Sequence, residues 1–127
     1  MNDVEGVLRA YCSLCTIQMN TLELARSFGF LANKGADISS NQVVLTAKQN
    51  SQLNSLMFTS GLYDATGDFA YRVGMPGKSG VGGAIVACVP NRFSIAVWYP
   101  KLNQVGNSVA GLYALEQFAN KVNLQLF

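Results

Sequence analysis

The sequence predicts an α+β fold, with three helices followed by a three-stranded antiparallel sheet and a C-terminal helix. Apolar residues recur at helical spacing in the first half of the chain, and helical spacing returns after residue 108. Between them lie apolar runs rich in β-branched and aromatic residues, joined by short connections that favour hairpins. We expect residues 1–127 to form a single region, with helices at about 3–62, strands at about 69–99 and the last helix at about 108–123.

The first expected helix follows Asp3, which is a plausible N-cap. Its apolar stripe consists of Val4, Val7, Leu8, Tyr11 and Cys15. The CxxC formed by Cys12 and Cys15 lies inside this helical pattern, without a second cysteine pair or a histidine to complete a zinc site. We therefore interpret both cysteines as packed helix residues.

Two further helices begin at capping signatures. Asn20 with Glu23 opens a helix that ends at Lys34-Gly35, and Thr46 with Gln49 opens the next one. The third helix is expected to bury Leu53, Leu56 and Met57 and to end near Gly61.

Three segments are expected to form the strands: Phe69–Val73, Ala84–Val89 and Phe93–Tyr99. The segment 84–89 has no polar alternation, which predicts that both of its faces are covered. A sheet of three strands covered by one terminal helix leaves a long apolar edge, so we expect the isolated chain to self-associate.

Composition excludes several function classes. Only 13% of the residues are charged, and the net charge of +2 is scattered along the chain, so nothing predicts nucleic-acid binding. No apolar run approaches the ~18 residues of a membrane span, and residues 1–5 lack the basic start of a signal peptide, which favours a cytoplasmic location. Histidine is absent, so these residues cannot form a complete Ser-His-Asp site. We expect no metal and no cofactor.

The segment 75–84 reads MPGKSGVGGA and invites comparison with phosphate-binding loops. A P-loop requires glycine where this chain has Arg72, and it opens a helix, whereas a strand is expected here. Lys-Ser-Gly beside a strand instead suits the wall of a serine nucleophile's site, as K-T-G does in penicillin-binding proteins and class A β-lactamases. This tripeptide alone is a weak signal, because a glycine-rich hairpin with an exposed lysine gives the same pattern.

The surrounding motifs make the signal specific. In order along the chain they are YCSLCTIQM (11–19), TSGLYD (59–64), FAYRVG (69–74), KSGVGG (78–83) and GNS (106–108). Together they closely resemble the C-terminal part of the serine-dependent glutaminases, which share the β-lactamase-like fold. The resemblance covers nearly all 127 residues. Gly77 and Ala84 depart from the family pattern, where alanine and glycine are expected.

The resemblance implies an amidohydrolase that converts L-glutamine to glutamate and ammonia through a serine acyl-enzyme. The family's nucleophile is the serine of an S-x-x-K motif, and no serine of this chain has lysine three residues later. The family's remaining strands and upstream substrate contacts come from the N-terminal half of the parent protein. We therefore expect this chain to be inactive alone, to need that half as a partner, and to belong to a homo-oligomer.

The resemblance also assigns roles to five positions. Tyr11 is expected to contact bound glutamine, and Tyr63 to contact substrate and transfer a proton beside the nucleophile. The Val81 backbone N–H is expected to form the oxyanion hole together with the nucleophile's own N–H. Lys78 and Ser79 are placed in the wall of the site, with Lys78 as a catalytic group and Ser79, like Val81, as a substrate-binding residue. From the residues alone, a core tyrosine is the favoured interpretation of Tyr11, and Val81 could be a plain strand residue.

Two other functions stay open at this point. The chain could be a non-catalytic module that binds glutamine or glutamate or self-associates, or it could come from a penicillin-recognising relative. An ammonia assay and calorimetry with glutamine separate the first from the glutaminase, and labelling by a penicillin identifies the second.

Overall fold

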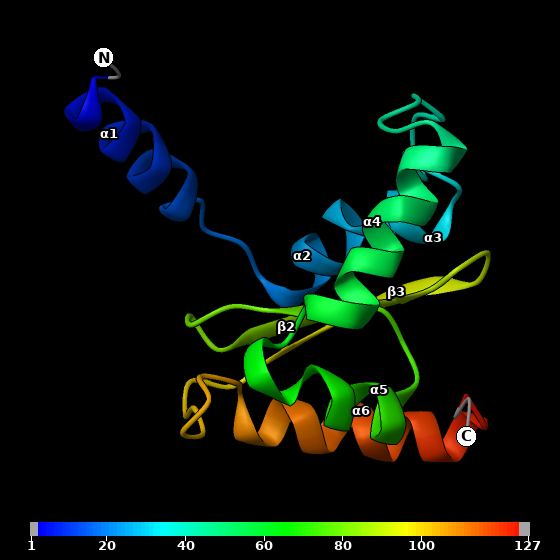
Figure 1. The fold of residues 1–127 in the computed structure, drawn as a ribbon. Helices are drawn as coiled ribbons and strands as arrows, with labels where there is room; N and C mark the ends of the chain where they lie inside the picture. The colour runs from blue at the N-terminus through cyan, green and yellow to red at the C-terminus, as the bar shows by residue number, and fades with distance from the viewer. Residues whose placement is uncertain (1–2, 125–127) are drawn as a thin grey trace.

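The structure is a computed structural model that describes residues 3–124. Its elements in chain order are α1 (Val4–Cys15), α2 (Thr21–Ser27), α3 (Gly29–Ala32), α4 (Ala47–Ser60), the 3-10 helix η1 (Tyr63–Ala65), α5 (Thr66–Val73), β1 (Gly77–Ser79), β2 (Ala84–Val89), β3 (Phe93–Trp98) and α6 (Val109–Val122). The strands form one antiparallel sheet in the order β1-β2-β3. Helices α5 and α6 lie against one face, and α2 to α4 lie on the other (Figure 1). The predicted α+β class and three-stranded antiparallel sheet are confirmed.

The predicted strand at Phe69–Val73 is wrong, because these residues form most of α5. Phe69 and Val73 are buried one helical turn apart, while Asp68 and Arg72 pair on the exposed side with an Oδ1–Nε distance of 2.8 Å. Gly74 ends the helix at φ +67°. Five residues rich in strand formers cannot reveal this pattern, which is visible only over two turns. The first strand of the sheet is Gly77–Ser79 instead.

Both predicted capping boxes are present. Asn20 Oδ1 accepts a hydrogen bond from the Glu23 N–H at 2.9 Å, and Thr46 Oγ1 accepts one from the Gln49 N–H at 3.3 Å. The single helix expected to follow Asn20 is interrupted at Phe28, which ends α2 and precedes α3.

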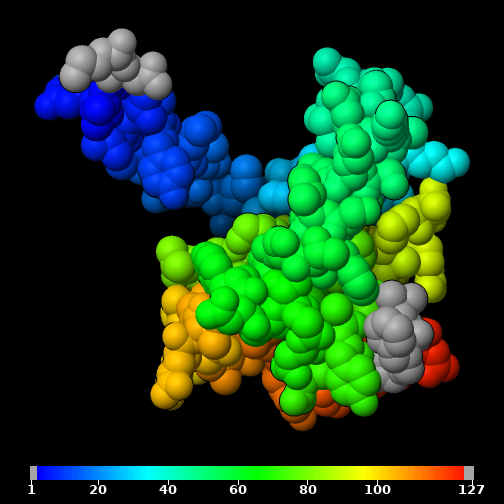
Figure 2. All heavy atoms as spheres, viewed as in Figure 1, coloured from blue at the N-terminus to red at the C-terminus, as the bar shows by residue number. Residues whose placement is uncertain are grey.

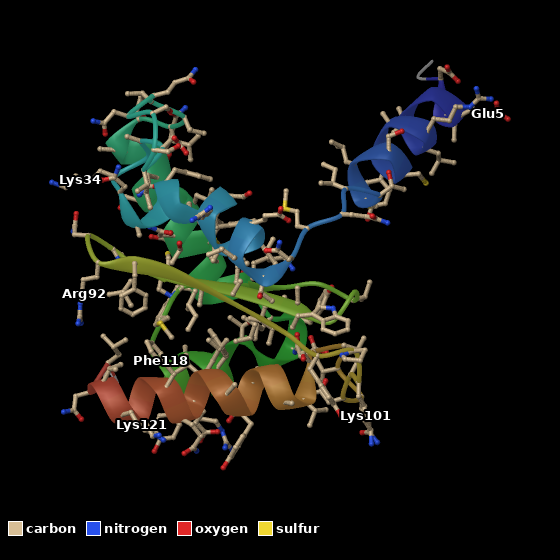
Figure 3. The ribbon with its side chains drawn as sticks, turned by 180° about the vertical axis from the view of Figure 1, so that it is seen from behind. Glu5, Lys34, Arg92, Lys101, Phe118 and Lys121 are labelled. Carbon is tan, nitrogen blue, oxygen red and sulfur yellow. The ribbon has the colours of Figure 1, made fainter. Side chains whose placement is uncertain are left out.

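Strand β2 is buried on both faces, as its unbroken apolar run predicts. Ile85 and Ala87 belong to a core cluster with α5 and α6, and Cys88 belongs to a second cluster with α3 and α4. The first cluster consists of Leu62, Phe69, Val73, Met75, Ile85, Ala87, Leu115 and Ala119. Figure 3 shows Phe118 of α6 directed toward the sheet. Its ring packs edge-to-face against that of Phe93, with 5.6 Å between the ring centroids.

The inner side of α4 is more polar than its sequence suggests. Asn50, Asn54 and Met57 are its buried residues, while Leu56 is 62% exposed, so the prediction that Leu56 is buried is wrong. Both asparagines donate through Nδ2 to the Leu31 carbonyl, at 3.0 and 3.1 Å. The spacing of hydrophobic residues cannot reveal that this face of α4 is buried. Its two asparagines bond to a carbonyl of another helix, α3.

Helix α1 stands away from the rest of the molecule (Figures 1 and 2). None of its residues is buried, so its apolar stripe and both of its cysteines are exposed in this chain, contrary to the expectation of packed residues. Within residues 3–124, no helix combines the length and the apolar character needed to cross a bilayer.

The free edge of β1 is covered by the end of α4. The Ser79 N–H donates to the Gly61 carbonyl at 3.1 Å. A Cβ on Gly61 would lie 1.7 Å from the Gly77 carbonyl oxygen, so only glycine permits this approach. Among residues 3–124, no strand pairs with the outer edge of β3, which is therefore the open edge of the sheet.

Replacement of Gly61 should test this docking. Gly61→Ala forces α4 and β1 apart, so its free energy of unfolding should fall by more than the ~1 kcal/mol of an average substitution. Gly67→Ala is the matched control, because nothing lies within 4 Å of its Cβ position in α5 and alanine favours helix by roughly 0.5–1 kcal/mol. Urea unfolding compares the two variants, and equal stabilities would contradict the docking geometry.

Thiol reactivity should test the placement of the cysteines. Cys12 and Cys15 are exposed, whereas burial raises the pKa of Cys88 to about 11, and its Sγ donates to Asn54 Oδ1 at 3.3 Å. Since the thiolate is the reactive form, a colorimetric disulfide reagent at pH 8 should modify two thiols rapidly and the third only after unfolding. Three rapid reactions would contradict the buried position of Cys88.

Candidate functional site

The glycine-rich segment forms the turn between β1 and β2. The Gly83 N–H donates to the Gly80 carbonyl and the Gly80 N–H donates to the Ala84 carbonyl, both at 3.0 Å. Val81 is the second residue of this turn, and its side chain is 73% exposed. No hydrogen bond among residues 3–124 uses the Val81 N–H. A backbone donor is therefore free at the tip of the hairpin.

Of the three glycines that flank Val81, only Gly83 is demanded by the local geometry. Gly83 has φ +90°, and a Cβ there would lie 2.5 Å from the Tyr99 carbonyl oxygen. Its own carbonyl accepts the Tyr99 N–H at 3.0 Å, which joins the turn to the chain that follows β3. Gly80 and Gly82 have open space at their Cβ positions and no positive φ, so the turn itself does not require them.

Lys78 and Ser79 point to opposite faces of β1. Lys78 is exposed, whereas Ser79 is 3% exposed and its hydroxyl oxygen has no hydrogen-bond partner among the described residues. The Lys78 ammonium group donates to the Ser79 carbonyl oxygen. The pairing register of β1 with β2 thus presents the lysine to the surface and buries the serine.

Tyr63 lies next to Lys78. The Lys78 Nζ is 5.0 Å from the centroid of the Tyr63 ring, within the range of a cation–π interaction. Tyr63 is 47% exposed and has φ +52°, a left-handed conformation that costs roughly 1–3 kcal/mol for a residue with a bulky side chain. Such strain persists only where neighbouring contacts enforce it, and it gathers at functional sites.

Tyr11 is 65% exposed on α1. A hydrogen bond with the Cys15 thiol is the main cause that raises the pKa of Tyr11, and Tyr63 is among the smaller contributors. Tyr11 and Tyr63 belong to different elements, α1 and η1.

The structure brings Tyr63, Lys78 and the Val81 turn to one end of the sheet, where the loop after β3 also lies (Figure 1). Sequence reasoning missed three supporting residues there. Gly61 docks on β1, Thr66 bonds to the backbone on both sides of Tyr63, and Asn107 donates to the Leu62 carbonyl. The motifs TSGLYD and GNS contain two of the three, but a motif does not reveal which of its members bonds to which.

Comparison with known proteins identifies the family. The glutaminase family model matches residues 1–127. The glutaminases of Pseudoalteromonas translucida (strain TAC 125) and Pseudomonas fluorescens (strain Pf0-1) are each 56% identical to this chain over 126 residues, 99% of its length. The chain spans 41% and 42% of the lengths of these two relatives.

Solved structures agree with the fold. A Bacillus subtilis glutaminase in covalent complex with 5-oxo-L-norleucine, formed by reaction with 6-diazo-5-oxo-L-norleucine, superposes with a TM-score of 0.91 at 32% identity and covers 98% of this chain and 44% of its own. A probable glutaminase from the same organism, complexed with 6-diazo-5-oxo-L-norleucine, gives 0.92 at 31% identity, with 98% and 43% covered. The predicted β-lactamase-like fold is confirmed. With a family model that matches its whole length and relatives more than half identical to it, this chain belongs to the glutaminase family.

Proposed function

We propose that the protein containing this chain hydrolyses the side-chain amide of L-glutamine, and that this chain forms one wall of the active site. The observation that carries the proposal is the free Val81 N–H at the same end of the sheet as the Tyr63–Lys78 pair, in a chain of the glutaminase family. The ligand of the Bacillus neighbour supports the substrate, because 5-oxo-L-norleucine has its ketone at the carbon where glutamine has its amide carbonyl.

In this reaction a serine attacks the amide carbon and charge develops on the carbonyl oxygen. The Val81 N–H stabilises that charge, since a fixed backbone donor needs no reorganisation when the oxyanion forms. The tight turn keeps this donor from being satisfied within the chain.

The Tyr63 hydroxyl is the proton-transfer group of this wall, and it also contacts substrate. Lys78 adds positive charge beside Tyr63. The Lys78 Nζ lies 5.0 Å from the centroid of the Tyr63 ring, close enough to interact electrostatically with the phenol. Tyr11 contacts the bound glutamine from α1. Ser79 supports the wall from the buried side of β1, because its hydroxyl is enclosed here.

The nucleophile comes from outside these residues. No serine of the chain is followed by lysine at the third position. The chain spans 41% of the length of the glutaminase from Pseudoalteromonas translucida. The N-terminal half of the parent protein therefore supplies the S-x-x-K motif and pairs with the open edge of β3. The parent works in the cytoplasm as a homo-oligomer, without a cofactor.

Substitution of Val81 tests the oxyanion role. Val81→Pro removes the N–H and suits the second position of a turn, so kcat of the glutaminase that carries it should fall by ~10²–10³-fold. Val81→Ala keeps the N–H and truncates an exposed side chain, so it should leave kcat close to its original value. Equal activities of the two variants in an ammonia-release assay would overturn the role of the amide.

The isolated chain tests the origin of the nucleophile. Because the chain contains no S-x-x-K serine, purified residues 1–127 should release no ammonia from L-glutamine. The same sequence joined to the S-x-x-K-bearing half of a glutaminase should be active in that assay. Turnover by residues 1–127 alone would contradict the proposal.

A further inference from the structure

The backbone around Tyr63 is held by two buried polar side chains. Thr66 is 7% exposed and Asn107 is fully buried. The Leu62 N–H donates to Thr66 Oγ1 at 3.0 Å, and the Thr66 hydroxyl donates to the Tyr63 carbonyl at 2.8 Å. Asn107 Nδ2 donates to the Leu62 carbonyl at 3.1 Å. The two hydrogen bonds to the Leu62 and Tyr63 carbonyls hold the peptide groups before and after the Tyr63 Cα, which are the groups that define its φ and ψ. The third holds the preceding peptide group, between Gly61 and Leu62.

These hydrogen bonds surround a residue with an unusual backbone conformation, Tyr63. Five non-glycine residues among those described have positive φ, and three of them are asparagines, for which this conformation is common. Tyr63, at φ +52°, is the aromatic member of the set. A tyrosine whose neighbours did not hold it would relax to an ordinary conformation, and its ring would then leave the position beside the Lys78 ammonium group.

Asn107 is itself well anchored. Its N–H donates to Asn103 Oδ1 at 3.0 Å, and its carbonyl accepts the Asn103 N–H at 2.8 Å. The preceding Gly106 lies against the Tyr63 ring, since a Cβ there would be 3.8 Å from Cε2. The loop before α6 therefore contacts both the peptide group that precedes Tyr63 and the Tyr63 ring.

The Asn107 side chain has a feature that packing alone does not explain. Its Oδ1 is buried and has no hydrogen-bond partner among residues 3–124. A buried acceptor without a partner is destabilising, and an apolar side chain would avoid it. The one side-chain hydrogen bond that Asn107 makes within these residues goes to the peptide group that precedes Tyr63.

We propose that Thr66 and Asn107 are positioning residues, which hold Tyr63 in its left-handed conformation so that its ring stays beside Lys78. The functional part of this inference rests on the proposed glutaminase activity, in which Tyr63 acts on substrate. The structural part stands on the hydrogen bonds and does not need that activity.

Two matched pairs of variants test the proposal. Thr66→Val keeps the shape of the side chain and removes both of its hydrogen bonds, whereas Thr66→Ser keeps the hydroxyl. Asn107→Ala is compared with Asn50→Ala, because Asn50 is also buried, donates one hydrogen bond to a leucine carbonyl at 3.0 Å and has an Oδ1 without a partner. The two asparagine variants should therefore lose similar stability, but only one of them loses the contact with the Tyr63 segment.

The first readout is NMR of isotope-labelled residues 1–127, using the Cα and Cβ shifts of Tyr63 and contacts between its ring protons and the Lys78 side chain. Thr66→Val and Asn107→Ala should change these signals, and Thr66→Ser and Asn50→Ala should preserve them. If Asn107→Ala lowers stability as Asn50→Ala does and leaves the Tyr63 signals unchanged, the positioning role is overturned.

The second readout is kinetics in the glutaminase that carries this chain. Misplacement of Tyr63 should lower kcat by roughly 10²-fold in Thr66→Val and Asn107→Ala, with KM changed much less. Thr66→Ser should restore kcat, and Asn50→Ala should leave it intact. Equal kcat in all four variants would overturn the functional part. If the unsubstituted protein does not hydrolyse glutamine, the proposed function fails, and the NMR result still decides the structural part.

Discussion

The docking of the Gly61 carbonyl against the edge of β1 is the contact on which the candidate site depends. It joins the end of α4 to the strand that carries Lys78, through the hydrogen bond from the Ser79 N–H. Because Gly61 is two residues before Tyr63, the same contact brings the tyrosine to the lysine. A side chain on Gly61 would separate the two elements. Because glycine has no Cβ, the end of α4 can pack directly against β1.

The rest of the fold supports this contact from both sides. The buried β2 strand holds β1 in register and binds α5 and α6 on one face and α3 and α4 on the other. Helix α5 continues directly from the turn that contains Tyr63, so its packing against α6 fixes the direction in which the tyrosine emerges. The geometry of the candidate site in this region therefore follows from a closely packed core, whereas α1 with Tyr11 has no such support among the described residues.

Local signals were sufficient to predict part of this arrangement. The capping boxes at Asn20 and Thr46 act within one helical turn, and the unbroken apolar run of β2 depends only on local composition. Both features can therefore be predicted from the sequence. Segment 69–73 forms a helix and not the predicted strand, because its strand-forming residues also fit one buried helix face. The family motifs located Tyr63, Lys78 and Val81, but the roles of Gly61, Thr66 and Asn107 depend on contacts between segments up to 45 residues apart. Such contacts leave no periodic pattern in a single sequence.

The most direct test of this end of the sheet as an active-site wall is a crystal structure of the glutaminase that contains this chain, after reaction with 6-diazo-5-oxo-L-norleucine. The oxygen derived from the ketone should lie about 2.7–3.1 Å from the Val81 nitrogen, the range expected for an oxyanion donor. The Tyr63 hydroxyl should contact the bound adduct while Tyr63 keeps its positive φ. An adduct whose oxygen points away from Val81 would contradict the assignment of this end of the sheet as the wall of the active site.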